Sequence, residues 1–438
     1  MKLWRGLAWW GFLSLTLFSP AQAGELNPLR DPAYFSYGIN YYPQRHLWEL
    51  MWTQYDVKTI ERDLTRVSNI GFNTVRIFLH FETFTAPLTI KPSYRNLHHF
   101  LDTAARKNLR VVVTLFDWSQ PYPAALKPQM LAHLKEVVRT FSQHPALLAW
   151  DLKNEPDLDY RFYDTPNVVD AWIQNFSHSL KMQPAASSVP LTVGWLHPSQ
   201  TSATYAHLDF LSFHHYEVAE NIGPRMLSLR QKLPGLPIIL GEVGLSVPPA
   251  KANGNSQKDF LLQSLRQAIE FKAKGIWFWT LYDFPPNRGR ERPEAENYFG
   301  LFSATENPKP VVAYLSKPCV FYYPTAHQLR DRVPFFRKQL TVCLRTTAPT
   351  KATLSLTSLD GNVFATLSAE LSDAGAQCVD FAMPFFWQSF TGKGYGVELS
   401  APSLASLGGE NSQRRCKISV DEYFSEMSPA AKQPGNHH

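Results

Sequence analysis

The sequence predicts an α/β protein, a (β/α)8 TIM barrel followed by a small all-β sandwich domain. Between residues 35 and 315, short apolar runs alternate with longer amphipathic stretches, the pattern of parallel strands joined by helices. Polar and aromatic residues collect just after the apolar runs, and helical periodicity stops beyond Pro308 and Pro310. A doubly wound open sheet shares the alternation but spreads such residues along a line. A barrel brings every strand end to one face, so we favour the barrel.

The predicted barrel has eight strands with amphipathic helical patterns between them, of which five are clear. The strands are expected at Phe35–Tyr41, Thr74–Leu79, Arg110–Leu115, Leu147–Leu152, Leu191–Gly194, Phe210–Phe213, Pro237–Gly241 and Gly275–Trp279. The helices, with apolar residues at i, i+3 and i+4, are expected at Val57–Ile70, Leu97–Lys107, Met130–Phe141, Val168–Leu180 and Phe260–Ala273.

The last third of the chain alternates apolar and polar residues in short segments. They lie at Gln339–Arg345, Ala352–Ser358, Phe364–Leu367, Cys378–Met383, Tyr395–Leu399 and Cys416–Val420. Turn signals such as Asp360-Gly361 between them predict a β-sandwich. We therefore expect a catalytic barrel over 24–317, a sandwich over 318–427 and a disordered tail over 428–438, where the residues are small and polar.

The N-terminus has the plan of a signal peptide. Lys2 and Arg5 precede an apolar run over 7–18, which is followed by Ala21-Gln22-Ala23. A run of about a dozen residues is too short to cross the hydrocarbon core as a helix. We expect residues 1–23 to be removed after Ala23 and the mature protein to be exported, periplasmic or extracellular, without a membrane span.

The composition limits the classes of molecule that the protein is expected to bind. A net charge of +6 without a dense basic run gives no electrostatic basis for nucleic-acid binding. Aromatic residues make up 13% of the chain, which suits sugar stacking as well as core packing. The cysteines all fall in the predicted sandwich and, after export, are expected to form disulfides in one of three pairings: Cys319, Cys343, Cys378 and Cys416. None is in a C-x-x-C pair, so zinc is disfavoured.

Two glutamates carry the predicted chemistry. Glu155 and Glu242 each follow an apolar strand, the fourth and the seventh, whose ends lie across the mouth of a barrel from one another. Hydrolysis of a glycosidic bond with retention needs one carboxylic acid as proton donor and a second carboxylate as nucleophile. This pair has the residue types and the placement for that reaction.

Longer motifs surround these glutamates. They are Trp150-Asp151-Leu152-Lys153-Asn154-Glu155-Pro156, Ser212-Phe213-His214-His215-Tyr216, Leu240-Gly241-Glu242-Val243-Gly244 and Trp277-Phe278-Trp279. With them the sequence resembles glycoside hydrolase clan A, and within it most resembles glycoside hydrolase family 5, the cellulase and mannanase family. The resemblance covers roughly 37–315 and does not extend to the predicted sandwich.

The resemblance implies a role for each matching residue. Glu155 matches the acid/base and Glu242 the nucleophile. The residues that match sugar-binding positions are Arg76, Asn154, His214, Tyr216 and Trp279. Arg76 also matches the arginine that keeps the nucleophile ionised. We therefore expect this cation to lower the pKa of Glu242, while Glu155 keeps its proton near neutrality.

One segment departs from the family pattern. Many members carry a histidine just after the third strand, where this chain has Phe116, Asp117 and Trp118. This departure leaves the subfamily and the sugar open, and His80, past the second strand, could partly substitute for the missing histidine.

The expected activity is that of a monomeric, endo-acting retaining β-glycanase, with β-mannan or β-1,4-glucan as substrate. The sequence has no metal-binding helix, no G-x-S-x-G elbow and no Gly-rich phosphate loop after a strand, so we predict neither a metal nor a cofactor. Two alternatives remain at this point: a non-catalytic carbohydrate-binding protein on a barrel scaffold, against which the presence of both glutamates argues, and a transglycosylase acting on envelope glycan.

Overall fold

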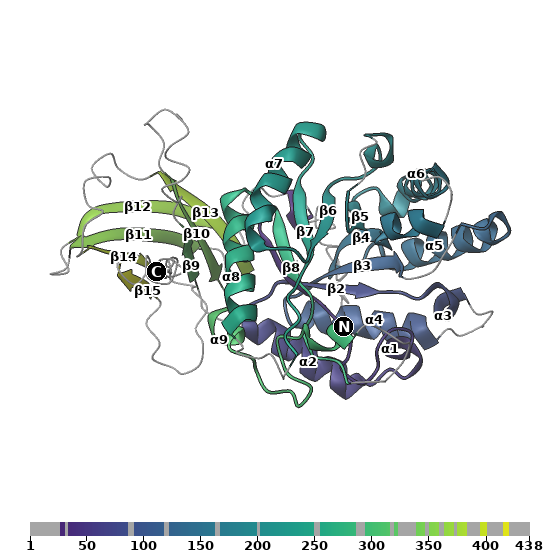
Figure 1. The fold of residues 1–438 in the computed structure, drawn as a ribbon, viewed down its shortest axis with the longest axis horizontal. Helices are drawn as coiled ribbons and strands as arrows, with labels where there is room; N and C mark the ends of the chain where they lie inside the picture. Colours follow the sequence, from purple (N-terminus) through teal and green to yellow (C-terminus); the bar gives the residue numbers. More distant parts are fainter. Residues whose placement is uncertain are drawn as a thin grey trace, which may run out of the picture.

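A computed structural model gives the fold of the chain (Figure 1). The residues that it describes are 27–30, 34–85, 92–117, 122–162, 167–198, 202–248, 255–285, 294–315, 319–322, 339–346, 350–358, 363–371, 375–382, 395–400 and 415–419. The predicted signal peptide and the predicted tail lie outside these residues.

Eight parallel strands close into a barrel, which confirms the predicted fold class. Strand β1 pairs with β2 and with β8, and each of the others pairs with its neighbours in sequence order. The strands are β1 (Ser36–Asn40), β2 (Thr74–Phe78), β3 (Arg110–Phe116), β4 (Leu147–Asn154), β5 (Leu191–Trp195), β6 (Leu211–His215), β7 (Ile238–Val243) and β8 (Gly275–Phe278).

Helices surround the barrel (Figure 1). They are α1 (Leu50–Thr53), α2 (Val57–Ile70), α3 (Phe81–Thr85), α4 (Pro92–Arg106), α5 (Lys127–Phe141), α6 (Asn167–Lys181), α7 (Ile222–Lys232), α8 (Asn255–Glu270) and α9 (Val311–Leu315). Helix α2 shows how sequence sets the bounds. The Asp56 side chain accepts a hydrogen bond from the N–H of Lys58 at its start, and Gly71 ends it at φ 111°.

The lower half of the barrel is filled by side chains. Val112, Ala149, Ile239 and Trp277 are completely buried there in one apolar cluster. Trp277 leaves no room on β1, because a Cβ atom on Gly38 would lie 2.6 Å from its Cδ1 atom. The barrel is therefore closed at this end, and a ligand site is confined to the carboxyl ends of the strands.

The C-terminal strands form two antiparallel sheets beside the barrel, on the side of α8 (Figure 1). One sheet has the order β13-β10-β9 and the other β12-β11-β14-β15. Their bounds are β9 (Cys319–Tyr322), β10 (Gln339–Thr346), β11 (Thr350–Ser358), β12 (Val363–Leu371), β13 (Gly375–Ala382), β14 (Tyr395–Ser400) and β15 (Arg415–Ser419). The backbone register sets Cys343 opposite Cys378.

Most differences from the predicted elements are short. Strand β9, of four residues, was not predicted, and β12 runs four residues beyond its predicted end at Leu367. Helix α7 was also missed, since Gly223 and Pro224 interrupt its apolar periodicity. No helix within the described residues is long and apolar enough to span a membrane.

Candidate active site

The two predicted catalytic glutamates lie close together at the mouth of the barrel. Glu242 is near the end of β7, and Glu155 directly follows β4. Glu155 has a left-handed backbone (φ 42°), and its N–H donates to the carbonyl of Gly194 on β5 at 2.6 Å. One oxygen of each carboxylate and a nitrogen of His214 all lie within 4.8 Å of one another. Residues far apart in the sequence are thus brought into one cluster.

Arg76 on β2 is the hub of this cluster. It is fully buried, and its Nη1 donates to Glu242 Oε1 at 2.6 Å. Its Nη2 donates to Asp151 Oδ2 at 2.6 Å and to Asn154 Oδ1 at 2.8 Å. Nη1 also donates to Asn40 Oδ1 at 3.0 Å. The planar guanidinium therefore ties together β1, β2, β4 and β7, and it fixes the position of Glu242.

His214 and Tyr216 complete the surroundings of the glutamates. His214 Nδ1 lies 2.7 Å from Glu155 Oε1 and 3.4 Å from Glu242 Oε2. The Tyr216 hydroxyl donates to Glu242 Oε2. Burial lowers the pKa of His214 to about 4, so this imidazole is neutral at pH 7. Both oxygens of Glu242 accept hydrogen bonds, one from a guanidinium and one from a phenol.

The environment of Glu155 favours its protonated form. Burial and then the nearby Asp157 carboxylate raise its pKa to about 7. The Arg76 charge acts in the opposite direction but contacts Glu242 instead. A carboxyl group with this pKa is half protonated near neutrality, which is what a general acid needs.

Arg76 acts to lower the pKa of Glu242, as expected, but the pKa of this carboxyl is nevertheless raised. Burial raises the pKa of Glu242, and the opposing effects of His214, Arg76 and the Tyr216 hydroxyl do not overcome it. The reason lies in the geometry, since the guanidinium is shared between two carboxylates and Asp151 takes part of its charge. Where the pair holds one proton, the contacts of Glu242 with a cation and a phenol favour that proton on Glu155.

Aromatic rings line the mouth next to the glutamates. Trp279, just after β8, is 7% exposed and packs edge-on against Phe78 with 6.0 Å between ring centroids. The Phe78 ring stacks on the Tyr42 ring, with 5.0 Å between the two centroids. The Arg76 guanidinium also lies over the Phe78 ring, 4.5 Å from its centroid. The bond between Trp279 and Thr280 is a cis peptide.

Two buried residues of the site were not among the predicted site residues. Asp151 accepts hydrogen bonds from Arg76, from Thr114 Oγ1 at 2.8 Å and from the N–H of Gly194 at 2.9 Å. Asn40 donates from Nδ2 to the carbonyl of Gly241 at 2.9 Å. A signal for Asp151 was present, because an aspartate inside an apolar strand must be paired to be buried.

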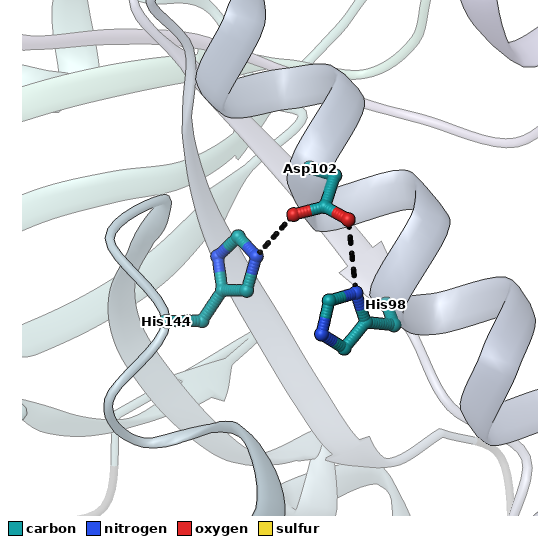
Figure 2. A group of neighbouring side chains, drawn as sticks. All are labelled: His98, Asp102 and His144. Carbon is teal, nitrogen blue, oxygen red and sulfur yellow. Dashed lines mark hydrogen bonds and ion pairs between the residues drawn. The ribbon is translucent and has the colours of Figure 1, made fainter.

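A second cluster of carboxylate and imidazole groups lies far from the mouth, among the outer helices. Asp102 on α4 joins His98, one turn earlier, to His144 in the loop before β4 (Figure 2). The Asp102 oxygens lie 2.9 Å from His98 Nδ1 and 3.1 Å from His144 Nε2. The N–H of Ala146 donates to His144 Nδ1 at 3.2 Å, so the neutral ring carries its proton on Nε2. A metal ion at Nε2 would have to displace this proton, so the residues fit a hydrogen-bonded clamp better than a metal site.

The buried cluster is also poorly suited to a metal ion. A nitrogen of His214 and the oxygens of Glu155 and Glu242 could reach one cation. Both Glu242 oxygens, however, already accept hydrogen bonds, and the Arg76 charge beside them would repel a metal ion. The donor set is better suited to acid/base and nucleophilic chemistry.

Comparison with known proteins defines the barrel further. Residues 111–281 match the family model described as glycosyl hydrolase catalytic core. The matched residues run from β3 to just beyond β8. This match bears out the resemblance to a glycoside hydrolase, and both Glu155 and Glu242 lie within the matched residues. No curated protein matches the sequence.

Solved structures share the fold of the barrel at low sequence identity. A variant of GH5_18 from Streptomyces cattleya in complex with Manb1-4GlcNAc has a TM-score of 0.54 at 16% identity, covering 68% of this chain and 82% of that one. An exo-beta-1,4-mannosidase from Opitutaceae bacterium strain TAV5 has a TM-score of 0.55 at 19% identity, covering 65% and 60%. For Bacteroides uniformis beta-glucuronidase 2 the TM-score is 0.52 at 17% identity, covering 88% and 46%.

Proposed function

We propose that the protein is a retaining β-glycosidase with Glu155 as acid/base and Glu242 as nucleophile. The observation that carries this proposal is the short distance between the two carboxylates, which come within 4.8 Å. Retaining enzymes hold their carboxyl groups about 5–5.5 Å apart, whereas inverting enzymes leave roughly 6.5–9.5 Å for a water molecule.

In the first step Glu242 attacks the anomeric carbon and the bond to the leaving oxygen breaks. Glu155 gives its proton to that oxygen, so the departing group leaves as an alcohol and Glu155 becomes a carboxylate. Arg76 and the Tyr216 hydroxyl hold the attacking carboxylate in place. Neutral His214, beside Glu155, can stabilise the carboxylate that forms, by donating from Nδ1.

In the second step Glu155 acts as base. It removes a proton from a water molecule, whose oxygen attacks the anomeric carbon as the bond to Glu242 breaks. The sugar leaves with its original β configuration, and Glu155 regains its proton. The raised pKa of Glu155, about 7, suits both directions of proton transfer near neutrality.

The charges of the site favour a neutral sugar. Among the described residues, the arginine and lysine buried near the mouth are Arg76 and Lys153, and each is paired with a carboxylate, Arg76 with Glu242 and Lys153 with Asp159. A sugar carboxylate would therefore meet acidic groups whose cations are already engaged. Of the three similar structures described above, two are named for mannose-containing ligands or substrates. We propose β-1,4-linked mannan or glucan as substrate, with endo action on the polymer.

The test is a screen of the purified protein on mannans, glucans, xylan and aryl β-glycosides, followed by NMR of the first product. We expect β-anomer to appear before mutarotation. A 2-deoxy-2-fluoro glycoside with a good leaving group should trap Glu242 as an ester, found by peptide mass spectrometry. Initial release of the α-anomer would overturn the retaining mechanism, and labelling of Glu155 in place of Glu242 would exchange the roles.

We also propose that the protein is exported and that Cys343 and Cys378 form a disulfide, a pairing supported by their opposite positions in the register of β10 and β13. N-terminal sequencing of the exported fraction should begin at Gly24. A start at Met1 would contradict the leader. Peptide mapping without reduction should yield the linked Cys343 and Cys378 peptides, and free thiols at both positions would contradict the bridge.

A further inference from the structure

The inner wall of the mouth continues outward from the catalytic glutamates along the second strand. Alternate residues of a strand point to the same face, so Arg76 and Phe78 are followed on that face by His80. The Arg76 guanidinium lies 4.5 Å from the centre of the Phe78 ring. His80 thus lies on the wall one step further from the barrel floor than Phe78.

Asp117 lies next to His80 on this wall. It directly follows β3, and its N–H donates to the carbonyl of Leu79 at 3.2 Å. The Tyr42 hydroxyl donates to its Oδ2 at 2.5 Å, and the Tyr42 ring stacks on Phe78. The first three strands therefore build one continuous surface, from the catalytic cluster through two stacked rings to an imidazole and a carboxylate.

The His80 imidazole is held close to Asp117 without a hydrogen bond. Its Nε2 lies 3.3 Å from Asp117 Oδ2, and this nitrogen is buried with no hydrogen-bond partner. His80 is 4% exposed and the predicted nucleophile Glu242 is 3% exposed. His80 is therefore no more deeply buried than a residue that is expected to contact the sugar. A buried ring nitrogen without a hydrogen bond calls for a ligand that completes it.

We propose that His80 and Asp117 form a hydroxyl-binding pair of the glycan site, in which one sugar hydroxyl donates to the Asp117 carboxylate and accepts from His80 Nε2. The proposal rests on the glycosidase function proposed above. A hydroxyl oxygen can donate once and accept from a second group, which this pair requires. The pair would recognise a neutral sugar ring beside Tyr42, and its carboxylate would disfavour a carboxylated sugar at this position.

Two observations place the pair within reach of a sugar bound at the glutamates. The Asp117 charge contributes to the raised pKa of Glu155, which shows that the two groups are close. Trp279, matched to the aromatic residue beneath the sugar, packs edge-on against Phe78, the ring between Arg76 and His80. Asp117 also lies in the segment in which the sequence departs from the family pattern, and His80, two residues past the end of β2, provides an imidazole where many relatives have one after β3.

The experiment combines substitutions in the protein with the removal of single hydroxyl groups from the sugar. We would measure kcat/KM for wild type, His80→Ala and Asp117→Ala on aryl β-mannosides and β-glucosides that each lack one hydroxyl. Wild type should lose roughly 10- to 100-fold for one missing hydroxyl, since a hydrogen bond to a charged group is lost. Each variant should lose a similar factor on the parent sugar and then be insensitive to removal of that same hydroxyl.

A matched control separates binding from structure. Asp63 is another buried aspartate that accepts from a tyrosine, with Tyr41 Oη at 2.8 Å, but it belongs to helix α2, outside the barrel. Asp63→Ala should lower the melting temperature and leave the dependence on each hydroxyl as in wild type. Equal losses on all sugars in His80→Ala and Asp117→Ala would overturn the proposal. If either fails to fold, His80→Gln and Asp117→Asn provide the same comparison.

The outcome also distinguishes this proposal from the proposed function. If wild type binds the sugars without cleaving them, the glycosidase function fails, and dissociation constants for the same deoxygenated series still test the pair. If wild type cleaves the sugars but no hydroxyl couples to His80 or Asp117, the pair is refuted while the glycosidase function stands. If wild type neither binds nor cleaves any sugar of the series, both are refuted.

Discussion

Both the buried cluster of Glu155, His214 and Glu242 and the outer cluster of His98, Asp102 and His144 combine carboxylates with imidazoles. In each, three ligand-type atoms lie within 4.8 Å of one another. The difference lies in what surrounds them. The His214 and Glu242 side chains are at most 5% exposed, whereas His98 is 60% and Asp102 45% exposed.

Burial gives the two clusters opposite electrostatics. In the buried cluster, loss of water raises the pKa of both glutamates, against the opposing charge of Arg76. In the outer cluster, burial would also raise the pKa of Asp102, but hydrogen bonds with His144 and His98 outweigh it and lower this pKa. Only the buried cluster keeps a carboxyl group that can give up a proton near pH 7.

The strongest test of this contrast is removal of the nucleophile. Glu242→Ala should lower kcat/KM by at least about 10⁴-fold on every substrate, because no glycosyl-enzyme can form. Added azide should enter the vacant site and give the α-glycosyl azide from a β-substrate, identified by NMR. A β-azide from this variant would mean that the two glutamates have exchanged roles.

The next largest effect is expected from the acid/base. Glu155→Ala should lose roughly 10²- to 10⁴-fold on polysaccharide, which needs a proton for its leaving oxygen. Aryl glycosides with good leaving groups should still undergo the first step, and azide should then give the β-glycosyl azide. An equal loss on both kinds of substrate would contradict the role of Glu155 as proton donor.

A smaller effect should follow from the charge next to Glu155. The general acid must be protonated, so kcat/KM should fall as the pH rises through about 7. Asp157→Asn removes the first charge that raises this pKa, and the alkaline limb should move to lower pH. The Asp157 carboxylate also accepts from the N–H groups of Leu196 and His197, so melting temperature is measured in parallel. A limb that stays in place would assign it to another group.

The smallest effect is expected in the outer cluster. Asp102→Asn should leave kcat/KM unchanged and lower the free energy of unfolding by about 1 kcal/mol or less. Because the pKa of Asp102 is lowered in the folded state, this difference is present above the unfolded pKa and should vanish as acid protonates the wild-type carboxyl. Zinc should not raise the melting temperature, given the proton on His144 Nε2. A zinc-dependent increase lost in Asp102→Asn would instead establish a metal site.

The two clusters also show how much of the fold and of the site could be predicted from the sequence. Strand ends marked by Arg76, Asn154 and Glu242 were enough to predict the barrel and to expect these residues at one face, because parallel strands place their carboxyl ends together. Asp151 was visible as an acid inside an apolar run, yet its partner lies 75 positions away on β2. The direction of the pKa shift at Glu242 depends on the sum of burial and several charges, which no local pattern contains.

Packing and strand pairing with other segments explain the two elements that were not predicted from the sequence. Helix α7 contains Gly223 and Pro224 near its start, and a Cβ on Gly223 would lie 2.3 Å from the Phe271 ring. Close packing against α8 and the chain that follows it therefore holds this helix, where propensity does not. Strand β9 has only four residues, and its identity as a strand comes from pairing with β10.

The shared guanidinium of Arg76 has a consequence for inhibition. One cation faces two carboxylates, Asp151 and Glu242, so this inner group carries one net negative charge while Glu155 is protonated. A glycosyl transition state gains positive charge on its ring, and a fixed anionic environment stabilises it without reorganisation. Basic iminosugars carry such a charge in their protonated form, and ionisation of Glu155 above pH 7 adds a second anion beside them. Their affinity should therefore increase with pH across the range in which catalysis declines.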